Sequence, residues 1–495
     1  MPTYPPILRP LVLPLIALPL WALAGGHAQS PGASQPDTRP AQTASSRPGS
    51  LERSVRSLRQ ADLDAIRDRV IPLIEKHTGR KFKSIPKLEF AHNSRIGRIL
   101  SSEIEVQIRN QFPSLAKKEL EHMASQTASQ LSLNLLGKFD LESRVLYILP
   151  GMFEILVKKK KIPKDRERQL LELVVAHELT HALQDQYLSL SSLYSRVRDQ
   201  ASLHAISGAI EGHATWIQDE IAKDLHLEKA AKDYHDLLPG AVGKGAKLFG
   251  QRYQRDLYIS YYSRGAAFFA RLVKSRATQA SWTFLEHLPD NSNFLYRSAL
   301  PESLEITPSK VDKKPQLLAG LARLFTKRPH SIAASTADQS LLRSFLQQAP
   351  RKQVDEILAP LERAWFVQAG NPSRMGFTMA MEFRDADAAR HFFEATPKFI
   401  HRELGRALLY ESKLTLMPPL PLKPPEAFGS HTDRTQVTYT YLKGRFGQTK
   451  GDIRWYRHGR HVVQIDITNL RMTSDQMDAM ARRALSLIRT ASSAR

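Results

Sequence analysis

Apolar residues recur three and four positions apart through much of the first part of the chain. This spacing is the period of an α-helix, and it is found over residues 58–75 and again over 164–286. Two shorter segments, 86–90 and 144–149, have the length and composition of β-strands. The pattern therefore predicts a mostly helical domain over residues 51–300 that contains a small sheet.

The pattern changes in the last part of the chain. Strands and helices are predicted in mixed order there, the strands over 375–383, 437–442, 453–456 and 461–467 and the helices over 387–404 and 476–490. This order predicts a small α+β domain over residues 346–495, for which binding or regulation is the expected role. Residues 301–345 include Pro301, Pro308 and Pro315 and are predicted to be a linker with short helices. The fold class expected for the whole chain is α+β.

The first residues have the features of an export signal. An apolar stretch runs from Leu11 to Ala24, and Gly26-His27-Ala28 fits a small-x-small cleavage site. We therefore expect a signal peptide over 1–28, with an uncleaved anchor as the alternative, and a disordered linker over 29–50. The apolar stretch is short for a transmembrane helix, so no membrane span is expected in the mature chain. The protein is predicted to be periplasmic or secreted.

Composition narrows the possible chemistry and partners. The 495 residues include no cysteine, which excludes thiolate metal ligands, disulfides and a cysteine nucleophile. The formal net charge of +22 favours anionic partners such as envelope polymers. The densest basic cluster, residues 158–161, would either steer acidic substrates or form a solvated turn. No glycine-rich phosphate loop and no RNA-binding sheet motif is present, so nucleic acid is not an expected partner.

The most specific motif is His177-Glu178-Leu179-Thr180-His181, within the apolar helical segment. On a helix, residues four apart project from one face, so both imidazoles can reach a single Zn²⁺. Glu178 would then contact a metal-bound water and act as its general base. The surrounding apolar residues predict a buried helix, in which unpartnered polar groups would be costly. The alternative is a core helix whose histidines are merely hydrogen-bonded.

Glu211 is the candidate for a third ligand, and a surface glutamate on an amphipathic helix is the alternative. It lies within a segment rich in small residues, which would let its helix approach the motif helix closely. His204, two turns earlier on the same face, is expected to be a hydrogen-bonded structural residue, with a ligand or a substrate contact as the alternatives, whereas His213 points to a different face. Asp185 would orient an imidazole or remain an exposed carboxylate. The histidines of the last domain show no metal-binding spacing; they are His391, His401, His431, His458 and His461.

The run from His177 to Gln186, followed by Glu211-Gly212-x-Ala214-Thr215, resembles exported bacterial zinc metallopeptidases of the gluzincin type. The resemblance covers about residues 130–300. It implies one Zn²⁺ per chain held by His177, His181 and Glu211, with Glu178 as general base and a peptide or protein as substrate. It also implies that an edge strand before the motif helix, here 144–149, pairs with substrate.

The chain departs from thermolysin-like members of this group in its longer gap before Glu211. It also lacks an obvious downstream His or Tyr for the transition state. One of Tyr258, Tyr261 and Tyr262 could supply a hydrogen bond to the oxyanion, but aromatic packing is the expected role of any single one. The predicted function is an exported zinc metallopeptidase. The alternative is an inactive or non-peptidase, basic envelope-binding protein that retains a zinc site.

Overall fold

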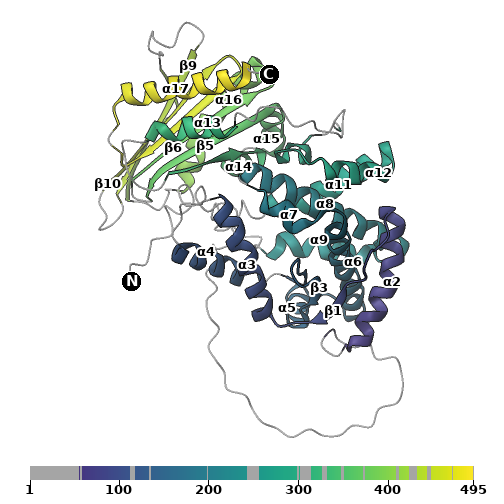
Figure 1. Ribbon diagram of the computed structural model, residues 1–495. Helices are drawn as coiled ribbons and strands as arrows, with labels where there is room; N and C mark the ends of the chain where they lie inside the picture. Colours follow the sequence, from purple (N-terminus) through teal and green to yellow (C-terminus); the bar gives the residue numbers. More distant parts are fainter. Residues whose placement is uncertain are drawn as a thin grey trace, which may run out of the picture.

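The computed structural model describes most of the chain after residue 54. The described residues are 55, 58–111, 117–132, 135–197, 199–241, 256–297, 300, 314–325, 332–346, 350–371, 374–407, 412–422, 432–442, 448–470 and 472–493. The predicted signal peptide and disordered linker lie outside them, as do Pro301, Pro308 and His431. The fold is α+β, as predicted, with a helical unit beside a larger sheet (Figure 1).

The helical unit confirms the helices and short strands predicted from periodicity. Its helices are α2 (Gln60–Thr78), α3 (Asn93–Gln111), α4 (Lys117–Ser132), α5 (Pro150–Lys160), α6 (Lys164–Leu188), α7 (Leu190–Ser195), α8 (Gln200–Asp224), α9 (Glu228–Ala241), the π-helix η3 (Ile259–Arg264), α11 (Gly265–Arg276), α12 (Gln279–Glu286) and the 3-10 helix η4 (Ser292–Leu295). Its strands are β1 (Lys87–Phe90), β2 (Gly137–Phe139) and β3 (Val145–Ile148).

One expectation about this small sheet is wrong. The strand predicted over 144–149 is β3, and it is the middle strand, paired in parallel with β1 and antiparallel with β2. β2 is the edge strand that packs against α6. Pairing order depends on tertiary packing and not on the alternation within one strand, so the sequence did not distinguish the middle strand from the edge.

Helices α6 and α8 form the centre of the helical unit. Apolar side chains surround α6 on all sides, and residues such as Leu171, Val175 and Leu179 are fully buried. Two glycines allow a close helix contact, because a Cβ added to Gly212 of α8 would lie 2.5 Å from the Cα of Gly265 in α11. The small residues near Glu211 were expected to let its helix approach α6, but Gly212 makes its close contact with α11, and a Cβ at Gly208 would meet Leu295.

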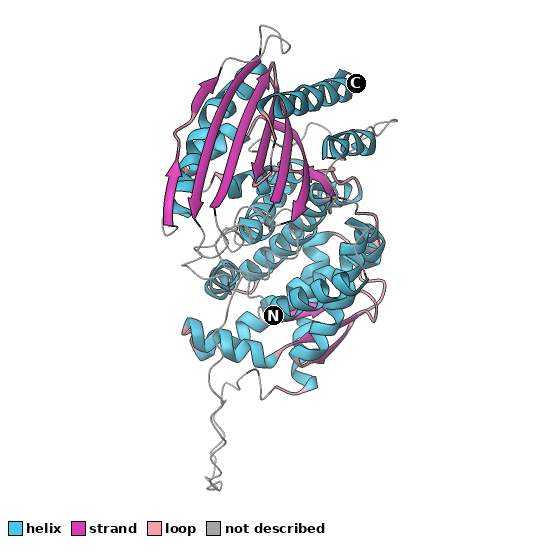
Figure 2. Ribbon diagram, turned by 90° about the vertical axis from the view of Figure 1, so that its left-hand side faces the viewer, coloured by secondary structure: helices cyan, strands magenta, loops and turns pink. Residues whose placement is uncertain are grey.

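The second unit is a sheet with helices on both faces (Figure 2). Its strand order is β4-β5-β6-β11-β10-β9-β7, and β8 also pairs with β9. The strands are β4 (Ile332–Ala337), β5 (Leu361–Asn371), β6 (Arg374–Phe383), β7 (Ser412–Leu416), β8 (Leu420–Leu422), β9 (Thr432–Leu442), β10 (Gln448–His458) and β11 (His461–Thr468). One face packs against α14 (Gln339–Phe345), α15 (Arg351–Leu358) and α16 (Ala386–Ala407), and the other against α13 (Lys314–Ala322) and α17 (Ser474–Ser493).

The predicted strands and helices of this unit are present as β6, β9, β10, β11, α16 and α17, but four strands were not predicted. One of them, β4, lies inside the segment expected to be a linker and pairs antiparallel with β5. The sheet therefore begins before residue 346. None of the described helices combines the length and apolar character needed to cross a membrane.

Candidate metal centre

Helix α6 places the two motif histidines on one face. His177 and His181 are one turn apart, and their Nε2 atoms lie 3.1 Å from each other. His177 is 2 % exposed, and the residues between and around the two histidines are largely apolar and buried. Both rings are therefore held in a packed environment, with their Nε2 atoms directed toward the same point.

Glu211 of α8 completes a group of three potential ligands. Its Oε2 lies 3.2 Å from Nε2 of His177 and 3.4 Å from Nε2 of His181. One ligand atom from each residue lies within 4.8 Å of the other two, so a single ion can contact all three. Two imidazole nitrogens and one carboxylate oxygen form a donor set typical of catalytic zinc sites. The structure thus brings the three predicted ligands together, and the identity of the metal stays a prediction.

Two glutamines contact the Nδ1 atoms of the imidazoles, opposite the Nε2 atoms that face the other ligands. Neither glutamine was predicted from the sequence. Nδ1 of His177 lies 3.1 Å from Oε1 of Gln218, and Nδ1 of His181 lies 2.8 Å from Oε1 of Gln184. If each Nδ1–H donates to its amide oxygen, each Nε2 keeps a lone pair for a metal. Ligating histidines in metalloproteins commonly have such partners. This feature of the chain therefore fits a metal site.

Gln184 also connects the two central helices. Its Nε2 donates to the backbone carbonyl of Ile210 on α8 at 3.0 Å and lies 3.1 Å from Nδ1 of His213. The side chain is fully buried. One glutamine thus sets both the ring orientation of His181 and the position of α8 next to Glu211.

The ionisable ligands shift each other's pKa. Burial opposes a charge on His181, but the carboxylate of Glu211 raises the pKa of its imidazole well above the ordinary value. Burial also opposes a charge on Glu211, yet His181 and His177 hold the pKa of the carboxyl well below its usual range. Glu211 is therefore ionised at neutral pH, and this is the form that binds a cation.

Glu178 is held by the edge strand β2. Its Oε2 accepts a hydrogen bond of 2.8 Å from the backbone N–H of Phe139. The absence of a side chain at Gly137 permits this approach, because a Cβ there would lie 3.0 Å from Cγ of Glu178 and 3.0 Å from Cγ1 of Val174. The strand beside the motif helix therefore fixes the carboxylate predicted to be the general base.

A cavity of about 680 Å³ lies against the four predicted site residues, His177, Glu178, His181 and Glu211. Its other walls come from α3, the end of α4, β2, α7, α8 and the tyrosines of α9 and η3. The volume lies within the range usual for small-molecule and substrate pockets. The metal-binding group is thus accessible from a space large enough for a substrate.

Two tyrosines lie close to the ligands. The ring of Tyr262 on η3 stacks against His177 with centroids 5.8 Å apart, and the ring of Tyr234 on α9 lies 6.1 Å from His177. Burial, followed by nearby carboxylates, raises the pKa of both phenols well above the ordinary value. Both keep their protons at neutral pH and can donate a hydrogen bond. Tyr262 was among the three predicted tyrosines, and Tyr234 was missed.

The competing histidines lie outside the metal-binding group. Nδ1 of His204 lies 3.0 Å from Oδ2 of Asp338, a residue that directly follows β4. His213 is enclosed by aromatic rings that include Trp216 and Phe269, and burial lowers its pKa to about 3. His213 is thus a neutral core residue, as its position on a different helix face indicated.

The orienting role expected for Asp185 is not observed. Its Oδ1 accepts a hydrogen bond of 2.9 Å from the backbone N–H of Leu190, at the start of α7. Asp185 is also buried, so it is not an exposed carboxylate either. The neighbouring Gln184, three residues after His181, lies beside its Nδ1, and the carboxylate of Asp185 binds the start of α7 instead.

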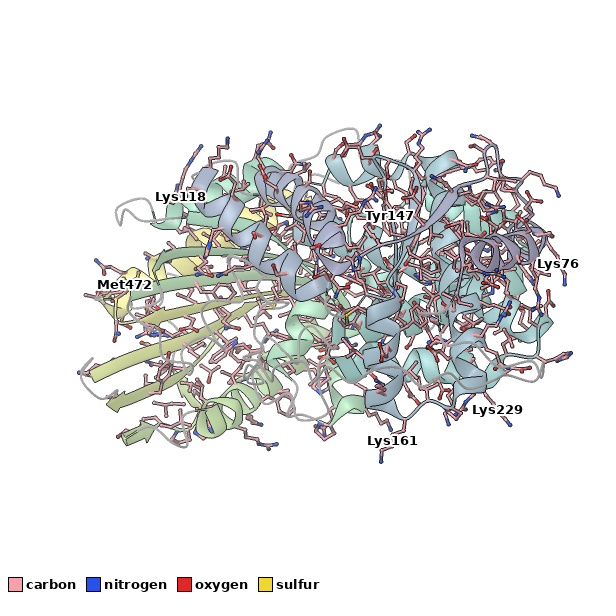
Figure 3. All side chains as sticks on the ribbon, turned by 90° about the horizontal axis from the view of Figure 1, so that it is seen from below. Lys76, Lys118, Tyr147, Lys161, Lys229 and Met472 are labelled. Carbon is pink, nitrogen blue, oxygen red and sulfur yellow. The ribbon has the colours of Figure 1, made fainter. Side chains whose placement is uncertain are left out.

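Other predicted features lie away from this centre. The described histidines of the second unit, His391, His401, His458 and His461, do not form a group of metal-ligand type. In the basic cluster at residues 158–161, Lys158 binds Glu154 at 2.7 Å, and both Lys158 and Lys161 are exposed. Figure 3 shows Lys161 at the periphery of the helical unit. The side chains of Lys159 and Lys160 lie outside the described part of the structure.

Comparisons with known proteins do not assign a family. No protein-family model and no curated protein sequence matches the chain. Among solved structures, one match is a protein from Chloroflexus aurantiacus described as a "putative hydrolase with a novel fold". It shares 13 % identity with a TM-score of 0.35, over 48 % of this chain and 87 % of that one. A similarity at this level supports no conclusion about the activity of this chain.

Proposed function

We propose that this protein is a metal-dependent hydrolase that cleaves amide bonds, with Zn²⁺ held by His177, His181 and Glu211. The observation that carries the proposal is the convergence of three ligand atoms on one point at the wall of a cavity, with both imidazoles oriented through Nδ1. A merely structural cluster of histidines would not require this orientation, nor a carboxylate fixed beside it.

In this proposal each residue of the site has a separate chemical role. A zinc ion bound there supplies Lewis-acid chemistry, lowering the pKa of a water and polarising a carbonyl. Glu178, positioned by the N–H of Phe139, takes a proton from the attacking water and transfers it to the nitrogen that leaves. Tyr262 and Tyr234, whose rings lie near that of His177, would donate a hydrogen bond to the oxygen that gains negative charge.

The preference for peptide bonds over other amides rests on the resemblance to gluzincin-type metallopeptidases. Export to the periplasm or the medium rests on the features of residues 1–28. Anionic envelope polymers are proposed as further partners because of the net charge of +22. Each of these points is part of the proposal.

The first test is metal content by elemental analysis of the purified protein after incubation with zinc and removal of excess. We expect about one zinc per chain. His181→Ala should lose it, whereas His287→Ala, which removes an exposed histidine away from the site, should retain it. Absence of zinc in the wild type after reconstitution would refute the metal site.

The second test separates catalysis from metal binding. Glu178→Gln should keep the zinc and lose hydrolysis of a peptide library, by at least about 100-fold, because it removes the general base but no ligand. If wild type and Glu178→Gln bind zinc alike and neither cleaves any amide, the alternative of a non-catalytic binding protein is supported instead.

A further inference from the structure

The cavity beside the metal centre has an aliphatic end built from the α3–α4 pair. Two helices supply its lining: Ile99, Leu100, Ile104 and Val106 come from α3, and Leu131 comes from α4, with Leu135 following it. Val106 is 46 % exposed, which makes it one of the few large apolar side chains at the described surface. Together these side chains give the cavity an aliphatic wall, which an apolar group of a ligand can cover.

The construction of this end disfavours a peptide as its occupant. Both of its walls are helices, whose backbone N–H and C=O groups are already bonded within the helix. A peptide entering here would bury amide groups with few partners, at a cost for each one. Three polar residues of α3 also belong to the lining, Ser102, Glu103 and Gln107; Glu103 binds Lys138 at 3.0 Å through Oε2, and its Oε1 has no hydrogen-bond partner among the described residues. A hydrocarbon chain carries no group that needs a partner.

The size of the cavity also favours a long group. Its volume of about 680 Å³ exceeds the space that one amino-acid side chain requires. The polar residues that would act on a bond, Glu178 and the three ligands, line the same cavity but come from α6 and α8. A substrate can therefore place a scissile amide at the metal centre and extend an apolar chain toward α3 and α4.

We propose that the substrate is an N-acylated amino acid or peptide whose long, unbranched acyl chain occupies the α3–α4 end of the cavity. This inference rests on the proposed function. In the reaction, the oxygen of water bonds to the acyl carbon and the C–N bond breaks. The products are a fatty acid and a free amine, and the amine nitrogen receives the proton taken from water by Glu178.

The kinetic test uses one peptide carrying an acetyl, an octanoyl or a dodecanoyl group, each below its micelle concentration. The ratio kcat/KM for acyl cleavage should rise about fourfold per added methylene until the cavity is filled, as expected from the transfer free energy of a methylene. Equal values for the acetyl and dodecanoyl substrates would overturn the inference. So would a rate set by the apolar side chains of the peptide and not by the acyl group.

A matched pair of variants tests where the acyl chain of the substrate binds. Val106→Asp places a charge at the aliphatic wall, and Ile155→Asp places the same charge on α5, at a residue that is 56 % exposed and does not line the cavity. We expect Val106→Asp to lower the ratio of dodecanoyl to acetyl kcat/KM by tenfold or more, and Ile155→Asp to leave this ratio unchanged. Equal behaviour of the two variants would contradict the assignment.

A binding measurement distinguishes failure of this inference from failure of the proposed function. Dodecanoate should displace a fluorescent polyene fatty acid from the wild-type protein and from Glu178→Gln, and less effectively from Val106→Asp. If dodecanoate binds in this way but no amide is cleaved, the hydrolase proposal fails and the acyl-chain site stands. If amides are cleaved but dodecanoate does not bind, the hydrolase proposal stands and the acyl-chain site fails.

Discussion

Replacing the two glutamines behind the imidazoles should separate metal affinity from fold stability. Gln184→Met removes three interactions of a fully buried side chain, with His181, with the carbonyl of Ile210 and with His213. Two imidazole nitrogens then lack this partner, at about 1–3 kcal/mol each, so we expect a loss of about 2–6 kcal/mol in the free energy of unfolding.

Gln218→Met is the matched control, because Gln218 has a weaker structural role. Its Oε1 pairs with His177, while its own Nε2 is buried without a hydrogen-bond partner among the described residues. The substitution removes one bond and also removes an unsatisfied donor, so the expected loss is about 0–1 kcal/mol. Both variants should nevertheless weaken zinc binding by about 10–100-fold, since each removes the hydrogen bond that orients the ring of a histidine ligand.

Two assays test this pair. Urea unfolding in the presence of a chelator gives the stability of each metal-free protein, and competition with a fluorescent zinc chelator gives the affinity. Wild-type zinc affinity in Gln218→Met would refute the view that the glutamine orients His177 for a metal. Equal stability losses in the two variants would refute the view that Gln184 joins α6 to α8.

Three further substitutions test the packing around the site and the second unit. Because burial and a neighbouring carboxylate raise the pKa of Asp466 to about 7, the folded chain holds this proton more tightly than the unfolded chain, and stability falls as pH rises from about 4 to 7. Asp466→Asn should therefore be more stable than wild type at pH 8 and equal to it at pH 4 in urea titrations; a constant difference would contradict this. Gly212→Ala places a Cβ 2.5 Å from the backbone of α11 and should cost about 1–3 kcal/mol in thermal unfolding, whereas Gly97→Ala, with open space around it, should cost nothing. Asp338→Ala leaves His204 without its buried partner and should cost about 3–5 kcal/mol in urea unfolding, and a loss below 1 kcal/mol would show that the pair is not a structural link.

The ligand group could be predicted from sequence because its geometry is local. His177 and His181 share a helix face through a fixed spacing. The small residues around Glu211 were expected to face the motif helix, whereas Gly212 contacts Gly265 of α11. The position of Gln218 near the ligands could also have been predicted, since it lies two turns after Glu211 on the same face of α8. Gln184 lies one turn after His181, but glutamine is common on helices and was not distinguished from a surface residue.

Features set by tertiary packing were not predictable in this way. Strand β5 is buried on both faces, so its sequence does not alternate, and β4 lies in a segment with too few apolar residues to indicate a strand. The order of β1, β3 and β2 depends on contacts with α2 and α6. Tyr234 comes from α9, and nothing in its sequence context places that helix beside His177.

The second unit contributes directly to the position of Glu211. Helix α8 begins after Asp199, whose carboxylate accepts the N–H of Ser202 at 3.0 Å and the hydroxyl of Thr336 on β4. Ser335 of β4 accepts the N–H of Gln200 at 3.1 Å. The first-turn N–H groups, which a helix cannot satisfy within itself, are thus bonded partly by the sheet. Because the helix that carries Glu211 is anchored there, the sheet helps to position one of the three candidate metal ligands.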